Sequence, residues 1–113
     1  MNLVHTKRLL TEKLDGLDAR ALLVEVLYSS IELLSMEDND FSWSYWENQA
    51  AAVAEVHSIL SVIEAGELPD RIKVSVLFAP TGPIQEVSLS SGWADPFLKV
   101  AEHFDNAEKV LWP

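Results

Sequence analysis

The chain contains no cysteine, and its longest uncharged stretches are short. Without cysteine, disulfide bonds, thiolate nucleophiles and cysteine-ligated metal clusters are excluded, and nothing favours a secreted disulfide scaffold. Stretches such as residues 74–85 fall well short of the ~20 apolar residues that a membrane-spanning helix needs. No basic segment followed by an apolar run opens the sequence, so a signal peptide is not predicted. We therefore expect a cytoplasmic protein without membrane association.

Lysine and arginine are missing from residues 21–70, which hold ten acidic residues and a formal charge of −10. Residues 1–20 sum to +1 and residues 71–113 to −1. Such a negative field repels phosphate backbones, and the chain lacks the basic surface from which nucleic-acid binding draws its affinity. Nucleic acid is therefore not an expected partner. The acidic segment is either a solvated surface or a docking face for a basic protein.

Apolar residues are plentiful by contrast. They make up 49% of the 113 residues, and charged residues make up 23%, which is ordinary for a globular protein. A chain of this length builds one sizeable core without disulfides or metals. We expect residues 1–113 to form a single domain.

Helical spacing of the apolar residues predicts a mainly α fold of about four to five packed helices. The first helix is predicted to begin near Thr6, which acts as its cap, and to end before a turn at Asp15–Gly16. The second runs from Asp18, its predicted N-cap, to about Met36. Its surface is apolar almost all round, which is expected of a helix that lies centrally in the fold or buries one side in a second copy of the chain.

Two further helices have clear ends. The third begins within residues 40–49 and ends near Ala65, where Gly66 is a natural stop. The last begins with Asp95 as cap and Pro96 in its first turn. Its apolar face consists of Phe97, Val100, Ala101, Phe104, Ala107 and Leu111.

Residues 71–91 carry conflicting signals. Alternating apolar residues favour a β-hairpin with strands at 72–79 and 84–90, which would give an α+β fold. Pro69–Asp70 is nevertheless a good helix start, and an isolated hairpin is marginally stable. We predict a short helix at 70–79 followed by an irregular Pro/Gly turn, and the hairpin is the alternative.

The stretch "DFSWSYWENQ", residues 40–49, is rich in aromatic side chains. If Ser42 caps the third helix, Phe41 and Trp46 occupy the two positions of a hydrophobic staple. If Ser44 caps it, Glu47 completes a capping box. On the helical wheel Tyr45 and Trp46 face the core, together with Phe41 as part of the helix start.

Trp43 falls outside the apolar arc of that helix. An exposed tryptophan on an acidic surface is typical of an interface anchor. We predict that Trp43 contacts a partner together with the nearby acids of the sequence, which are Asp38, Asp40, Glu47 and Glu55.

No metal or cofactor site is predicted. Asp38, Asp40 and Ser42 occupy the first, third and fifth positions of a calcium-binding loop, but the sixth and twelfth positions hold Trp43 and Gln49. The calcium loop requires glycine and glutamate there.

Catalytic motifs are equally weak. His5, His57 and His103 lie far apart in the sequence, and "SLSSGW" lacks the pattern of a nucleophile elbow. We predict no enzymatic activity. A small hydrolase or ligand-binding protein that uses carboxylate and histidine chemistry is an alternative.

Residues 43–90 resemble short uncharacterised bacterial proteins with a Trp-led helix, an acidic-Ala-Gly stop and a Gly-rich turn. The similarity lies in the order of "WSYWENQAAAVAEVHSILSVIEAGELP" and "APTGPI". Some of these proteins are suspected to be immunity-type proteins, which neutralise a toxin. The resemblance implies a helix at 70–79 and a protein partner.

The main functional hypothesis is therefore a non-catalytic interaction protein that holds a basic partner, as an immunity protein or inhibitor does. The first alternative is a structural homodimer in which the helix at 18–36 forms part of the interface.

Overall fold

The computed structural model describes residues 3–11, 14 and 16–113, and all the regular structure in this part of the chain is helical. The helices are α1 (Val4–Thr11), α2 (Ala19–Leu34), α3 (Gln49–Glu64), α4 (Arg71–Phe78), α5 (Pro83–Ser91) and α6 (Ala94–Leu111). The predicted mainly α fold is confirmed. The radius of gyration is 13.0 Å, as expected for one compact unit of this length.

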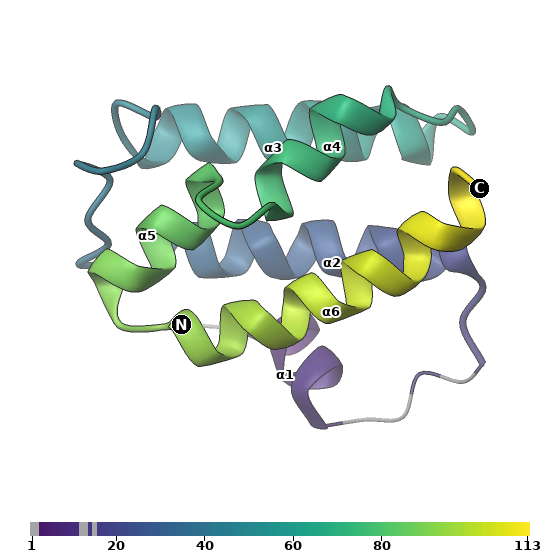
Figure 1. Ribbon diagram of the computed structural model, residues 1–113, viewed down its shortest axis with the longest axis horizontal. Helices are drawn as coiled ribbons and strands as arrows, with labels where there is room; N and C mark the ends of the chain where they lie inside the picture. Colours follow the sequence, from purple (N-terminus) through teal and green to yellow (C-terminus); the bar gives the residue numbers. More distant parts are fainter. Residues whose placement is uncertain (1–2, 12–13, 15) are drawn as a thin grey trace.

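Helix α2 lies in the middle of the fold (Figure 1). It packs against α1, α3, α5 and α6, and α5 also contacts both α4 and α6. Buried side chains of α2 point to several sides of the helix; they are Leu23, Val26, Leu27, Ser29, Ser30, Leu33 and Leu34. The central position predicted for this helix is confirmed. Its N-cap is Asp18, which accepts a hydrogen bond from the Ala21 N–H at 2.7 Å.

Helix α1 is capped differently from the prediction. Thr6 lies inside the helix rather than at its start, and its side chain is buried. The backbone N–H groups of His5 and Thr6 donate to the Glu32 carboxylate of α2 at 2.9 and 2.8 Å. A carboxylate from a neighbouring helix thus accepts hydrogen bonds from the first N–H groups of α1. Its negative charge also stabilises the positive end of the helix dipole. Of the predicted turn at Asp15–Gly16, Asp15 lies outside the described residues.

Helix α3 begins at Gln49, the last residue of the predicted range 40–49 and later than either predicted cap implies. Its N-cap is Asn48, whose side chain accepts from the Ala51 N–H at 2.9 Å, and residues 41–48 form turns and bends. The predicted caps Ser42 and Ser44 were therefore wrong. The helix ends as predicted, because Gly66 adopts a φ of 91° and its N–H bonds to the Ile63 carbonyl.

Residues 71–91 form two helices, and the alternative hairpin was wrong. Asp70 caps α4 by accepting from the Ile72 N–H at 3.1 Å. The predicted turn lies at 79–82, where Thr81 has a φ of 63°. A Cβ on Gly82 would lie 2.4 Å from the Val76 carbonyl oxygen, so the tight passage into α5 requires glycine. Helix α5 itself was not predicted, because its opening Pro83 and the preceding Gly82 both indicate a turn.

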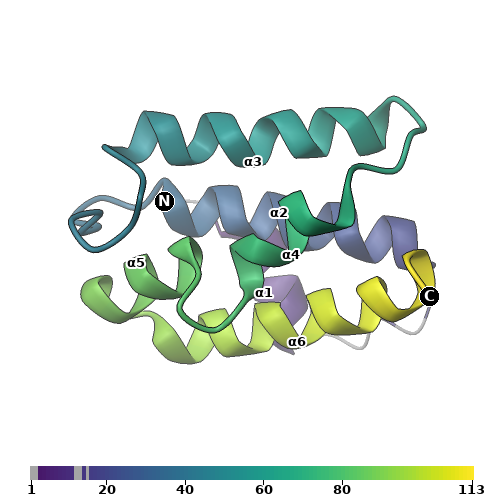
Figure 2. The same ribbon diagram turned by 45° about the horizontal axis from the view of Figure 1, so that its top comes forward.

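Helix α6 carries the predicted apolar face. Phe97, Val100, Phe104 and Ala107 are buried, and Ala101 and Leu111 are half-buried against the core. The predicted cap was placed too late, since Trp93 occupies the N-cap and Asp95 lies in the first turn. Figure 2 shows α6 on the side of α2 opposite α3. None of the helices in the described part of the chain is long and apolar enough to cross a membrane.

Candidate functional site

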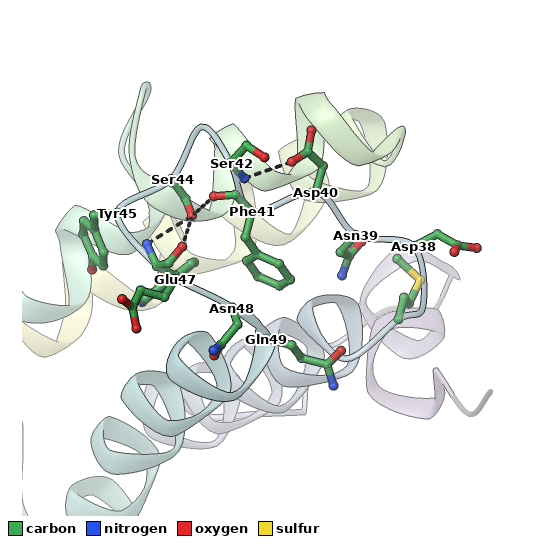
Figure 3. A pocket seen from close by; sticks show the side chains of 12 residues that line it. Asp38, Asn39, Asp40, Phe41, Ser42, Ser44, Tyr45, Glu47, Asn48 and Gln49 are labelled. Atoms are coloured by element: carbon green, nitrogen blue, oxygen red, sulfur yellow. Dashed lines mark hydrogen bonds between the residues drawn. The ribbon is translucent and has the colours of Figure 1, made fainter.

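The predicted partner-binding residues fall in the segment that joins α2 to α3. We call residues 36–48 the aromatic loop. Most of its residues, together with Gln49, line a hollow of about 720 Å³ (Figure 3). In Figure 3 Tyr45 and Glu47 lie toward one end of this hollow and Asp38 toward the other. All the predicted residues except Glu55, which lies on α3, therefore belong to one loop.

Contacts with distant helices fix the aromatic loop in place. The Asn39 side chain donates to the Leu33 carbonyl at 2.8 Å and accepts from the Trp93 indole N–H at 2.9 Å. The Asp40 backbone N–H donates to the Ser91 hydroxyl at 2.8 Å. The loop is thus tied to the end of α2, the end of α5 and the start of α6.

Hydrogen bonds within the loop stabilise its turns. The Ser42 N–H donates to the Asp40 carboxylate at 2.9 Å, and the Ser44 hydroxyl donates to the Phe41 carbonyl at 2.9 Å. Bonds from the Ser42 hydroxyl first, and from its N–H second, lower the pKa of Asp40 below its ordinary value. Asp38 has a φ of 68°, a left-handed conformation that aspartate tolerates better than most residues. These turns explain why the helix does not begin here.

Glu55 supports the aromatic side chains of the loop. Its carboxylate accepts the Tyr45 hydroxyl at 2.5 Å and the Trp46 indole N–H at 3.1 Å. The two rings meet edge to face with centroids 5.2 Å apart. Partial desolvation of the Tyr45 hydroxyl, followed by its hydrogen bond to Glu55, raises the pKa of Tyr45. The structure thus places Glu55 against the aromatic side chains of the loop, where both of its oxygens are already bonded.

The aromatic residues divide between core and surface. Trp46 is buried, as predicted, and Phe41 is half-buried. Tyr45 was predicted to face the core, but it is 60% exposed because it precedes the helix instead of belonging to its apolar face. Trp43 is 73% exposed. The loop surface therefore presents two aromatic rings, with Asp38 and Glu47 also exposed.

The histidines occupy separate places. The His103 ring is hydrogen bonded to the Leu9 carbonyl at 2.9 Å, and His5 stacks on Tyr28 and bonds to Glu25. His57 lies in a hollow of about 830 Å³ on α3, and the described residues that line it include no carboxylate. Within the described ranges no group of three or more His, Asp or Glu residues is placed to hold a metal ion. The described contacts of these rings bring together no nucleophile, base and orienting group.

Sequence reasoning missed the residues that anchor the loop. Ser91 and Trp93 lie 51 and 54 positions along the chain from their loop partners, and their bonds join segments that no local pattern connects. The only local signal was the Asn–Asp pair at 39–40, which is typical of a turn.

Comparisons with protein-family models, with curated proteins and with solved structures found no match for this chain.

Proposed function

We propose that the aromatic loop binds a basic partner protein and that the protein acts through this contact without catalysis of its own. The observation that carries the proposal is the position of Trp43, which is 73% exposed on a loop anchored to three helices. A tryptophan left in water forgoes the burial that favours apolar side chains in folded proteins. Bound against a partner, it regains that burial.

Anchoring makes the loop a favourable docking element. A mobile loop loses conformational freedom on binding, whereas a loop already held by hydrogen bonds loses little. Trp43 and Tyr45 are rigid rings with few rotatable bonds, and tryptophan and tyrosine are enriched among the residues that contribute most to protein interfaces. Truncation of such an anchor commonly costs about 2 kcal/mol or more of binding free energy.

The charges of the middle segment favour a basic partner. Several acids there are engaged within the fold: Glu32 caps α1, Glu25 bonds to Arg8 and His5, and Glu64 accepts the Tyr28 hydroxyl. Asp38 and Glu47, in contrast, are exposed on the aromatic loop, Glu47 at the end of the hollow where Tyr45 lies and Asp38 at the other end. Opposite charges across an interface speed association and select partners.

An immunity-type or inhibitor role is one form of this proposal, in which the partner is a basic toxin or enzyme. It is supported by the acidic charge of residues 21–70 and by the resemblance in the sequence. The alternative of a homodimer through α2 has less support, because the chain's own helices cover the apolar surface of α2 that suggested it.

Capture experiments at two salt concentrations test the proposal. The immobilised protein should retain a basic partner from an extract of its source cells, and retention should fall at high salt. Trp43→Ala should reduce retention strongly, whereas Val110→Ala, which alters a similarly exposed apolar residue on α6, should not. Capture that is insensitive both to salt and to Trp43→Ala would contradict the proposal.

A further inference from the structure

A second hollow lies away from the aromatic loop, between α4 and α6 with one residue of α5 at its edge. We call it the α4–α6 groove, and its volume is about 640 Å³. It is lined by Ile72, Ser75, Val76, Phe78, Ala79, Pro80, Gln85, Phe97, Leu98, Ala101, Glu102, Phe104, Asp105 and Glu108. None of these residues belongs to the aromatic loop, so the groove is a separate surface.

The groove has a rigid apolar floor and exposed apolar edges. Phe78 and Phe104 are buried in the floor and stack with centroids 4.6 Å apart and an interplanar angle of 18°. At the edges, Ile72 is 73% exposed and Leu98 is 58% exposed. Large aliphatic side chains of α4 and α6 thus remain exposed to water beside the two stacked phenylalanine rings of the floor. Contiguous exposed apolar surface of this kind marks binding grooves.

Acidic residues of α6 line one side of the groove. Glu102, Asp105 and Glu108 recur every third position of α6, which places them along one face of the helix. Two of them take part in ion pairs, Glu102 with Lys99 at 3.4 Å and Glu108 with Arg71 at 3.1 Å. The Lys99–Glu102 pair is exposed at both side chains and contributes little free energy, so a cation of a partner can replace Lys99 there. None of the described residues that line the groove is basic.

We propose that the α4–α6 groove binds an amphipathic helix of a partner protein, with an apolar face against Ile72 and Leu98 and basic residues toward α6. The lining residues of α6 extend from Phe97 to Glu108, a length of about three helical turns. An apolar stripe at the i, i+3, i+4 and i+7 positions fits a groove of this length. Lysine or arginine every three to four residues complements the three carboxylates. A second copy of this chain complements them poorly, because its formal charge is −10.

Binding of a synthetic peptide to the full chain tests this inference. The probe is a fluorescein-labelled helical peptide of about twelve residues, with leucine on one face and lysine elsewhere, a length that matches the groove. Two controls are matched to it: a scrambled peptide of the same composition and a version with glutamate in place of lysine. In fluorescence anisotropy the probe should bind at least about tenfold more tightly than either control, which corresponds to ~1.4 kcal/mol. Equal binding of the scrambled peptide would overturn the inference.

Substitutions in the protein test whether the probe binds in the groove. Leu98→Asp should weaken probe binding at least about tenfold, while Leu89→Asp, a similarly exposed leucine of α5 outside the groove, should leave it within about twofold. Both side chains are exposed, so both variants should fold, and circular dichroism checks this. Ile72→Ser should also weaken binding. Unchanged affinity in Leu98→Asp and Ile72→Ser together would overturn the inference.

Amide chemical shifts separate this inference from the proposed function. In ¹H–¹⁵N spectra the probe should perturb residues of α4 and α6, and Trp43→Ala should leave its affinity unchanged. Perturbations confined to the aromatic loop would overturn the groove proposal and leave the role of Trp43 standing. Self-association that disappears in Leu98→Asp would assign the groove to a second copy instead and would also overturn it.

Discussion

Single side chains decide how the aromatic loop presents Trp43. Asn39 joins the loop to α2 and to Trp93, and Glu55 of α3 accepts hydrogen bonds from two of the loop's aromatic side chains. Sequence reasoning found Trp43 as the residue outside the apolar arc, and the structure exposes it. The same reasoning misplaced Tyr45, because it assumed a helix where the Asp40–Ser42 turn prevails. The exposure of Trp43 agrees with the prediction, although the helix from whose apolar arc it was derived begins only at Gln49, and the bonds that anchor the loop were not predictable.

Removal of the Asn39 side chain should destabilise the protein. Asn39→Ala leaves the indole N–H of the buried Trp93 without its acceptor, and an unsatisfied polar group costs about 1–3 kcal/mol of unfolding free energy. Urea unfolding measures the change. Asn106→Ala, at an exposed position of α6, is the control and should change stability by less than about 0.5 kcal/mol. Equal stability of the two variants would contradict the anchoring role of Asn39.

The Asp40 carboxyl should titrate at lower pH than a free aspartate. Its pKa is lowered in the fold, so its stabilising contribution is complete above the unfolded pKa of about 3.9 and is lost as the pH falls through the lower folded value. Ser42→Ala removes the hydrogen bond from the Ser42 hydroxyl, which is the larger cause of the lowered pKa. The substitution should therefore raise the pKa of Asp40 toward its ordinary value. Carbon chemical shifts of the carboxyl group report this pKa. The matched variant Ser58→Ala on α3 should not alter it, and an unchanged pKa in Ser42→Ala would refute the assignment.

At the scale of elements, apolar periodicity predicted the helices but not all of their ends. Asp18, Asp70 and Gly66 act at the ends predicted for them, since each forms a bond or conformation local to its helix. Helix α1 departs from the prediction because its cap comes from Glu32 of another helix. Helix α5 was missed because proline and glycine signal a turn and a helix start alike.

The passage from α4 to α5 should tolerate only glycine at position 82. In Gly82→Ala the new methyl group would meet the Val76 and Ala79 carbonyl oxygens, and the backbone would have to shift. Forced overpacking of this kind costs about 1–3 kcal/mol. Gly16→Ala is the control, because among the described residues nothing lies within 4 Å of the place that its new methyl group would take. Thermal unfolding should show a lower midpoint for Gly82→Ala alone, and a similar midpoint for both variants would contradict the close approach.

For the whole molecule, the central position of α2 and the acidic net charge both predict a monomer. The apolar surface of α2 is covered by its neighbours within the chain, so it does not need a second copy. The formal charge of −10 also opposes self-association. Sedimentation equilibrium at micromolar concentration and low salt should give the monomer mass of 12.6 kDa. A mass about twice as large would support the homodimer alternative.

Trp43 and the exposed acids of the aromatic loop, Asp38 and Glu47, form the proposed contact with a basic partner. Calorimetric titration of the captured partner into the wild-type protein, Trp43→Ala and the double variant Asp38→Asn/Glu47→Gln tests this most directly. Trp43→Ala should weaken binding about thirtyfold or more at both low and high salt, since the loss of an apolar anchor of about 2 kcal/mol is not screened. The double variant should weaken it mainly at low salt. Wild-type affinity in Trp43→Ala would show that the partner does not bind through this tryptophan.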